Sequence, residues 1–162
     1  MKKIITASIA AVFCVAAVGC STASEKPDSV SSVSSAAESL SPAEKSEKLL
    51  KTVEFPSMVE VIPDKLEFYY GITTDDVTEF SAYICGSGMA PDEFGIFEAK
   101  DQASAEKIKA ALKARIDEQY ETFESYTPDA MYRFDDSFAE INGTTVIYAV
   151  CSDNSAAKEI LE

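Results

Sequence analysis

The sequence predicts an α+β fold, a two-layer sandwich in which one face of a sheet is covered by helices. Three observations support this prediction. Apolar and polar residues alternate along 77–85, an apolar stripe recurs every three or four residues along 104–125, and Asn142-Gly143 separates two apolar runs. Together they predict a roughly four-stranded sheet made of two β-hairpins, with a long helix and shorter helices packed on one face.

Two helices are expected before the first hairpin. Ser41-Pro42-Ala43-Glu44 has the pattern of a helix start, with serine as N-cap, proline at the first helical position and glutamate at the third. This helix should run to about residue 53. Pro63-Asp64 begins a second, short helix that reaches Tyr70 and ends at Gly71, the preferred C-terminal capping residue.

The first hairpin lies in the middle of the chain. Residues 77–85 place Phe80, Ala82 and Ile84 on one face of a strand, and residues 94–100 form its partner. The connection over residues 86–92 is too long for a tight turn. We therefore expect a hairpin with an extended, glycine-containing loop.

The long helix and the second hairpin complete the fold. Asp101 or Ser104 caps a helix that reaches about Ser125, and Pro128 ends it. The residues of its apolar stripe are predicted to be core: Ile108, Leu112, Ile116, Tyr120 and Phe123. Residues 134–141 and 144–151 form strands joined by Asn142-Gly143 in a type I′ turn. Asp153 or Ser155 then caps a terminal helix. A crossover through the long helix would make the second and third of these four strands parallel.

The first nineteen residues have the pattern of a bacterial lipoprotein signal peptide. Lys2 and Lys3 precede an apolar run of about fifteen residues, and the run ends at Ala17-Val18-Gly19-Cys20. Residues 1–19 should be removed and Cys20 should carry lipid, with at least two acyl chains for stable anchoring. The alternatives are an ordinary cleaved signal followed by an unrelated cysteine and, less favoured, an uncleaved membrane helix. We expect a lipid-anchored protein on the extracytoplasmic face of the cell membrane.

The amino-acid composition predicts two parts in the mature chain, a tether and a domain. Residues 20–42 are rich in serine, alanine and glutamate with few large apolar groups, so they are predicted to be the lipidated cysteine and a disordered tether. The tether's root-mean-square reach is on the order of 25 Å. Residues 43–162 are predicted to form a single α+β domain.

Charge and residue types exclude several functions. The net charge is -14, and removal of Lys2 and Lys3 with the signal peptide takes it to -16, which is incompatible with a basic nucleic-acid footprint. Histidine is absent, which removes Ser-His-Asp and Cys-His nucleophile systems and HExxH zinc sites. There is no P-loop and no GxGxxG motif. We expect a protein that is not an enzyme and has no cofactor.

The best candidate for a binding site is the loop of the first hairpin. Gly86, Ser87 and Gly88, followed by Asp92 and Glu93, could expose backbone N–H groups to an anion or present a serine hydroxyl. A plain hairpin connection is the alternative. The acidic pairs Asp75-Asp76, Asp92-Glu93 and Asp135-Asp136 lack EF-hand spacing, so we interpret them as solvated and predict no metal site.

Two cysteines remain once Cys14 is removed and Cys20 is lipidated. Cys85 and Cys151 lie near the ends of two strands that the expected topology makes parallel, and an exported protein permits a disulfide between them. Their Cα atoms would have to approach within about 7 Å, which requires neighbouring strands. Two buried free thiols are the favoured alternative.

Several segments together resemble a family of uncharacterised lipoproteins of low-GC Gram-positive bacteria, a domain of unknown function. These segments are Tyr69-Tyr70-Gly71-Ile72, Gly86-Ser87-Gly88 with Pro91-Asp92-Glu93, Phe97-Glu98-Ala99-Lys100-Asp101, and Phe123-Glu124-Ser125-Tyr126-Thr127-Pro128. The likeness covers about residues 53–161. It implies one compact domain in a Gram-positive envelope and transfers no catalytic residues. Cys85 and Cys151 are not part of the pattern.

These observations lead to three functional hypotheses. The first is a non-enzymatic module that binds a protein or peptide at the cell envelope, where the acidic surface would favour a basic partner. The second is a receptor-like module that captures a small ligand or ion with the loop over residues 86–92. The third is a hydrolase that works without histidine. Membrane attachment through Cys20 is common to all three, and the oligomeric state is left open.

Overall fold

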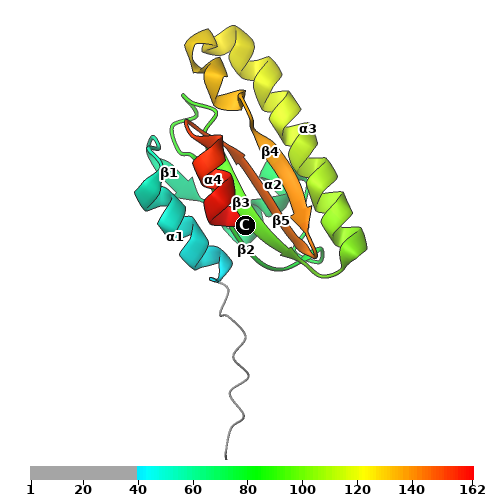
Figure 1. Cartoon of the computed structure of the whole chain (residues 1–162). Coiled ribbons are helices and arrows are strands. Elements are labelled where there is room, and N and C mark those ends of the chain that lie inside the picture. Colours follow the sequence, from blue (N-terminus) through cyan, green and yellow to red (C-terminus); the bar gives the residue numbers. More distant parts are fainter. Residues whose placement is uncertain (1–39) are drawn as a thin grey trace, which may run out of the picture. The chain divides into compact units, whose positions relative to one another are not determined.

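The computed structural model describes residues 40–162, and its element order matches the prediction closely (Figure 1). The predicted signal peptide, the predicted lipidation site Cys20 and most of the predicted tether lie outside the described residues. The helices are α1 (Pro42–Thr52), α2 (Pro63–Tyr70), α3 (Gln102–Tyr126), a 3-10 helix η1 (Pro128–Phe134) and α4 (Asn154–Leu161). The strands are β1 (Met58–Glu60), β2 (Val77–Cys85), β3 (Glu93–Ala99), β4 (Phe138–Asn142) and β5 (Thr145–Val150).

All five strands form one antiparallel sheet with the order β1-β2-β3-β5-β4. The α+β class, the two hairpins and the long helix are therefore confirmed. As expected, β3 and β4 run parallel to each other, because each is antiparallel to β5. The three-residue strand β1 is an addition to the four predicted strands. It is too short for its alternation to be visible in the sequence, and it pairs Met58 with Cys85.

Helices cover both faces of the sheet. α2 and α3 pack on the face that carries Phe97 and Tyr148, as predicted for one covered face. The short helices α1 and α4 lie against the opposite face, where Leu49 and Leu161 meet Phe94 (Figure 1). The physical reason is the composition of β3 and β5, whose residues are buried on both faces and do not alternate between apolar and polar.

Local capping signals were accurate. Ser41 and Glu44 form a capping box at the start of α1, and Asp101 accepts a hydrogen bond from Ser104 N at the start of α3. Asp153 caps α4 in the same way. Gly71 follows α2 in the left-handed conformation, with φ 65°. The short polar side chains and the glycine therefore define the helix ends that the sequence predicted.

Two details of the prediction are wrong. The β4–β5 turn has Gly143 and Thr144 at its centre, and only Gly143 has positive φ (62°), which is the pattern of a type II′ turn and not type I′. Tyr120 was predicted to be core but is 45% exposed: it lies outside the buried clusters, and its ring packs edge-on against Phe134 of η1.

Candidate functional site

The site is a cavity of about 560 Å³ between the loop over residues 86–91 and the C-terminal half of α3. The loop forms one wall, and Arg115, Gln119, Thr122, Phe123 and Tyr126 of α3 line the cavity from the other side. Tyr69 of α2, Ile84 and Cys85 of β2, and Asp92 and Glu93 also line the cavity. Its volume lies within the usual range of ligand cavities.

Backbone hydrogen bonds fix the loop at both ends. Cys85 N donates to Asp92 O (2.8 Å) and Gly88 N donates to Cys85 O (3.1 Å), so the first hairpin continues past the last paired strand residues. Gly86 N donates to Ser57 O (2.9 Å), which ties the loop to the segment before β1. Gly88 has φ 65°, a conformation that glycine adopts without steric cost. The loop therefore has a defined stem and an exposed tip.

A buried ion pair forms the floor of the cavity. Arg115 Nε donates to Glu93 Oε1 and Oε2 (both 3.2 Å), and Arg115 Nη2 donates to Glu93 Oε2 (3.0 Å). The Glu93 side chain is 3% exposed and that of Arg115 is 17% exposed. Burial raises the pKa of Glu93, and the guanidinium of Arg115 offsets part of that rise. Both carboxylate oxygens of Glu93 are thereby occupied, whereas Arg115 Nη1 forms no hydrogen bond to Glu93 and lies 2.9 Å from the side-chain amide of Gln119.

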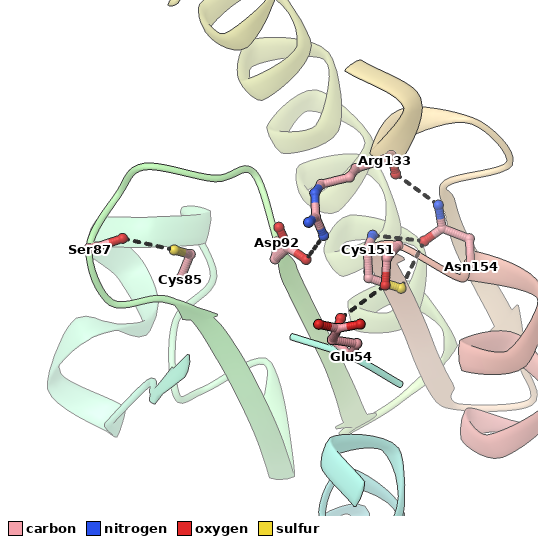
Figure 2. A network of polar contacts seen from close by, with 8 residues as sticks. Glu54, Cys85, Ser87, Asp92, Arg133, Cys151 and Asn154 are labelled. Carbon is pink, nitrogen blue, oxygen red and sulfur yellow. Dashed lines mark hydrogen bonds and ion pairs between the residues drawn. The ribbon is translucent and has the colours of Figure 1, made fainter. Parts of the chain in front are cut away.

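A second buried ion pair joins Asp92, the residue before Glu93, to Arg133; Figure 2 shows this pair. Arg133 of η1 donates to Asp92 Oδ1, and the Asp92 side chain is fully buried with its Oδ2 unpartnered. Burial raises the pKa of Asp92, against the opposing effect of Arg133. Asp92, just before β3, and Glu93, its first residue, thus place their carboxylates on opposite faces of the sheet, and each carboxylate is bound by one arginine.

Asn154 positions the 3-10 helix that carries Arg133. Its Nδ2 donates to Arg133 O and Asp135 O (both 2.8 Å), and its Oδ1 accepts from Cys151 N (3.0 Å). The side chain therefore joins η1 to the turn between β5 and α4 (Figure 2). This bridge holds Arg133 over Asp92.

The two thiols are in different environments. Cys85 Sγ is 3.3 Å from Ser87 Oγ, and although burial raises the pKa of Cys85, hydrogen bonds from Ser87 and from the backbone of Ala90, Ser87 and Met89 lower it below its ordinary value. Burial raises the pKa of Cys151 to about 11. Both are free thiols. Since β3 lies between their strands, they are separated by roughly two strand spacings, about 9.6 Å, which is too far for a disulfide.

The rim of the cavity is apolar and continues into a second hollow. Tyr126 OH donates to Met89 Sδ (3.6 Å), so the loop tip touches the end of α3 across the rim. Tyr69 and Ile84 also line a hollow of about 230 Å³ beside β1 and the start of α2, with Val59 and Ile62. The Phe68 ring packs edge-on against Tyr69 at 5.1 Å. We call the cavity, this hollow and their exposed rim the apolar groove; its exposed large apolar side chains are Val59, Ile62, Phe68, Met89 and Tyr126.

All five residues of the predicted binding loop line the cavity: Gly86, Ser87, Gly88, Asp92 and Glu93. The expectation that Asp92 and Glu93 are solvated is wrong, because both are buried and paired with arginine. Ser87 Oγ has Cys85 Sγ and Met89 N as its neighbours, both at 3.3 Å, and neither activates a serine as a base would.

Sequence reasoning missed the two arginines. Arg115 lies three residues after Leu112 on α3 and continues the buried line of Ala105, Ile108 and Leu112. A positive charge on the buried side of a helix needs an acidic partner, so the position of Arg115 in the sequence indicated a buried acid. Arg133 follows a proline-containing break, where no periodicity indicated its direction.

Neither a metal site nor a spanning helix is found among residues 40–162. No group of three or more cysteine, aspartate or glutamate residues in that range is placed to hold a metal ion. No helix in that range has both the length and the apolar character needed to cross a membrane.

The chain belongs to the family described as Domain of unknown function (DUF4358), whose pattern matches residues 51–151. That range covers the sheet, α2, α3 and the loop over residues 86–91. The expected membership of a domain of unknown function is therefore confirmed. Comparison with curated proteins and with solved structures gave no significant match.

Proposed function

We propose that this protein is a lipid-anchored lipoprotein of a Gram-positive envelope whose domain binds an extended or helical segment of another envelope protein in the apolar groove. The module is non-enzymatic in this proposal. The observation that carries it is the groove itself: a cavity continuous with a second hollow and surrounded by exposed apolar side chains.

The distribution of exposed apolar residues supports a macromolecular ligand. Five of the eight large apolar side chains exposed in the described part of the chain belong to the groove, and Phe68 is 76% exposed. Soluble proteins rarely leave such residues clustered unless a partner covers them. Aromatic and methionine side chains are also the types enriched at the centre of protein interfaces.

The polar groups of the groove support a peptide over a small polar ligand. At the floor, Arg115 occupies both oxygens of the Glu93 carboxylate, so this carboxylate is not free to bind a polar ligand. A peptide needs only apolar pockets and backbone contacts, which the loop and the α3 side chains supply. Small-ligand capture is the second candidate function, favoured by the size of the main cavity.

Charge and the N-terminal sequence complete the proposal. A net charge of -14 steers basic segments towards the domain and raises their association rate. The lipobox at Ala17-Val18-Gly19-Cys20 supports an anchor on the outer face of the membrane, which would place the partner within reach of the tether.

Site-specific photo-crosslinking tests the groove. A photoreactive phenylalanine analogue replaces Tyr126 in the groove, and in a matched control it replaces Tyr132 of η1, which is exposed to a similar extent (61% and 52%). We expect one defined envelope protein to crosslink from position 126 and not from position 132. Equal labelling from both positions, or none from 126, would contradict the proposal.

A second experiment separates the anchor from the groove. Intact-mass analysis of the mature protein should give a chain that begins at Cys20 with diacylglyceryl mass added, and Cys20→Ser should release the protein from the membrane. An unmodified secreted product would refute the anchor and leave the groove proposal standing.

A further inference from the structure

A second surface on this domain has an open strand edge. Among residues 40–162, β4 pairs only with β5, and Asn142 opposite Thr145 closes the two-residue turn. Hydrogen-bonded pairs alternate along an antiparallel ladder, so Phe138, Glu140 and Asn142 bond to β5 while the N–H and C=O groups of Ala139 and Ile141 point outward. Within residues 40–162, neither residue has a backbone hydrogen bond outside the β4–β5 ladder.

A groove of about 470 Å³ runs along this edge. Five consecutive residues of the chain, 137–141, line one side of it. Because successive side chains of a strand point to opposite faces, a groove that all five line must follow the backbone edge itself. Lys109 and Lys113 of α3 line the other side.

The two lysines give this groove a charge opposite to that of the whole chain. They are four residues apart on α3, hence one turn apart on the same side of the helix. Neither forms an ion pair within the described part of the chain, whereas Glu140 of the groove is paired with Lys158 at 2.7 Å. Two uncompensated ammonium groups therefore stand beside unpaired backbone groups.

We propose that the β4 edge binds an extended peptide segment as a sixth strand, with one carboxylate side chain of that segment placed between Lys109 and Lys113. Main-chain hydrogen bonds to Ala139 and Ile141 supply affinity, and the carboxylate supplies selectivity. Lysine near a strand edge disfavours pairing with uncharged or basic strands, so the same side chains reject segments that lack the carboxylate. A single carboxylate suffices, since a strongly acidic segment would be repelled by the rest of the surface.

The test uses the full chain and two fluorescein-labelled peptides of eight residues, in which valine and threonine alternate around one central glutamate or, in the matched control, one glutamine. We expect the glutamate peptide to bind about three- to tenfold more tightly than the glutamine peptide. Lys109→Ala/Lys113→Ala should remove that difference. Lys48→Ala/Lys100→Ala, which deletes the same charge elsewhere on the surface, should preserve it.

Amide hydrogen exchange locates the binding. We expect the glutamate peptide to slow exchange in β4, and Met89→Ser/Tyr126→Ser in the apolar groove to leave this protection unchanged. Equal affinity for the two peptides, absence of binding, or protection elsewhere than β4 would overturn the proposal. A concentration-dependent dimer abolished by the lysine substitutions would overturn it too, since the edge would then belong to a second copy.

Discussion

Replacement of Arg115 by methionine should destabilise this domain more than any surface substitution. Arg115→Met keeps a side chain of similar length but leaves the Glu93 carboxylate buried without its partner, and the Glu93 side chain is only 3% exposed. Breaking a buried ion pair in this way costs about 3–5 kcal/mol. The partial exposure of Arg115 favours the lower end, about 3 kcal/mol.

The consequence is measurable by urea unfolding. With a slope of about 1.5 kcal/mol per molar urea, a loss of about 3 kcal/mol lowers the midpoint by about 2 M. Glu93→Gln should cost less, because the guanidinium left behind reaches solvent. The double variant Glu93→Gln/Arg115→Met removes both charges and should be more stable than Arg115→Met alone.

The loss of stability caused by Arg115→Met should depend on pH. Burial raises the pKa of Glu93 above its ordinary value of 4.5, so the folded state holds that proton more tightly than the unfolded state. The stability that this proton contributes is complete below pH 4.5 and is lost as pH rises through the folded pKa. Arg115→Met removes the opposite charge and raises the pKa of Glu93 further. The variant should therefore lose more stability at pH 8 than at pH 5.

Either of two results would contradict this role of the Glu93–Arg115 pair. One is additivity, in which the double variant loses as much stability as the two single variants together. The other is a loss for Arg115→Met that is the same at pH 5 and pH 8.

Three further predictions concern the packing around the site. In native protein, iodoacetamide should alkylate Cys85 much faster than Cys151, because loop hydrogen bonds lower the pKa of the Cys85 thiol and burial raises that of Cys151 to about 11. The kinetics of alkylation, followed by intact mass, test this expectation. Ser87→Ala should slow the reaction of Cys85. Gly95→Ala should lower the free energy of unfolding by about 1–3 kcal/mol, because the added Cβ would lie 2.9 Å from both Phe97 Cε2 and Tyr148 Cε1. An unchanged midpoint of thermal or urea unfolding would contradict this. Asn154→Leu should lower the free energy of unfolding by about 2–3 kcal/mol and speed amide exchange in η1, because it deletes the hydrogen bonds that hold the helix carrying Arg133. Protection of η1 equal to that in the parent protein would contradict the role of Asn154 in holding η1.

Much of the fold could be predicted because it is encoded locally. Helix ends depend on short-range capping by Ser41, Asp101 and Asp153, and these signals need only a few adjacent residues. The insertion of β5 between β3 and β4 could not be read in the same way. It depends on pairing between residues far apart in the chain, and no local pattern specifies which strands become neighbours.

The site was partly predictable for the same reason. Its glycine-rich loop is a local feature, and all five predicted residues line the cavity. The burial of Asp92 and Glu93 was not predicted, because it depends on Arg115 and Arg133, which the fold brings from 22 and 41 residues away. The position of Arg115 on the buried side of α3 was the one available sign of that pairing.

The most direct measurement for the proposed function is amide hydrogen exchange of the protein with and without the segment recovered by crosslinking at position 126. We expect slower exchange over residues 86–91 and in the last turns of α3, with the α1 and α4 face unchanged. Protection confined to the β4 edge, or no protection at all, would contradict a peptide-binding role for the apolar groove.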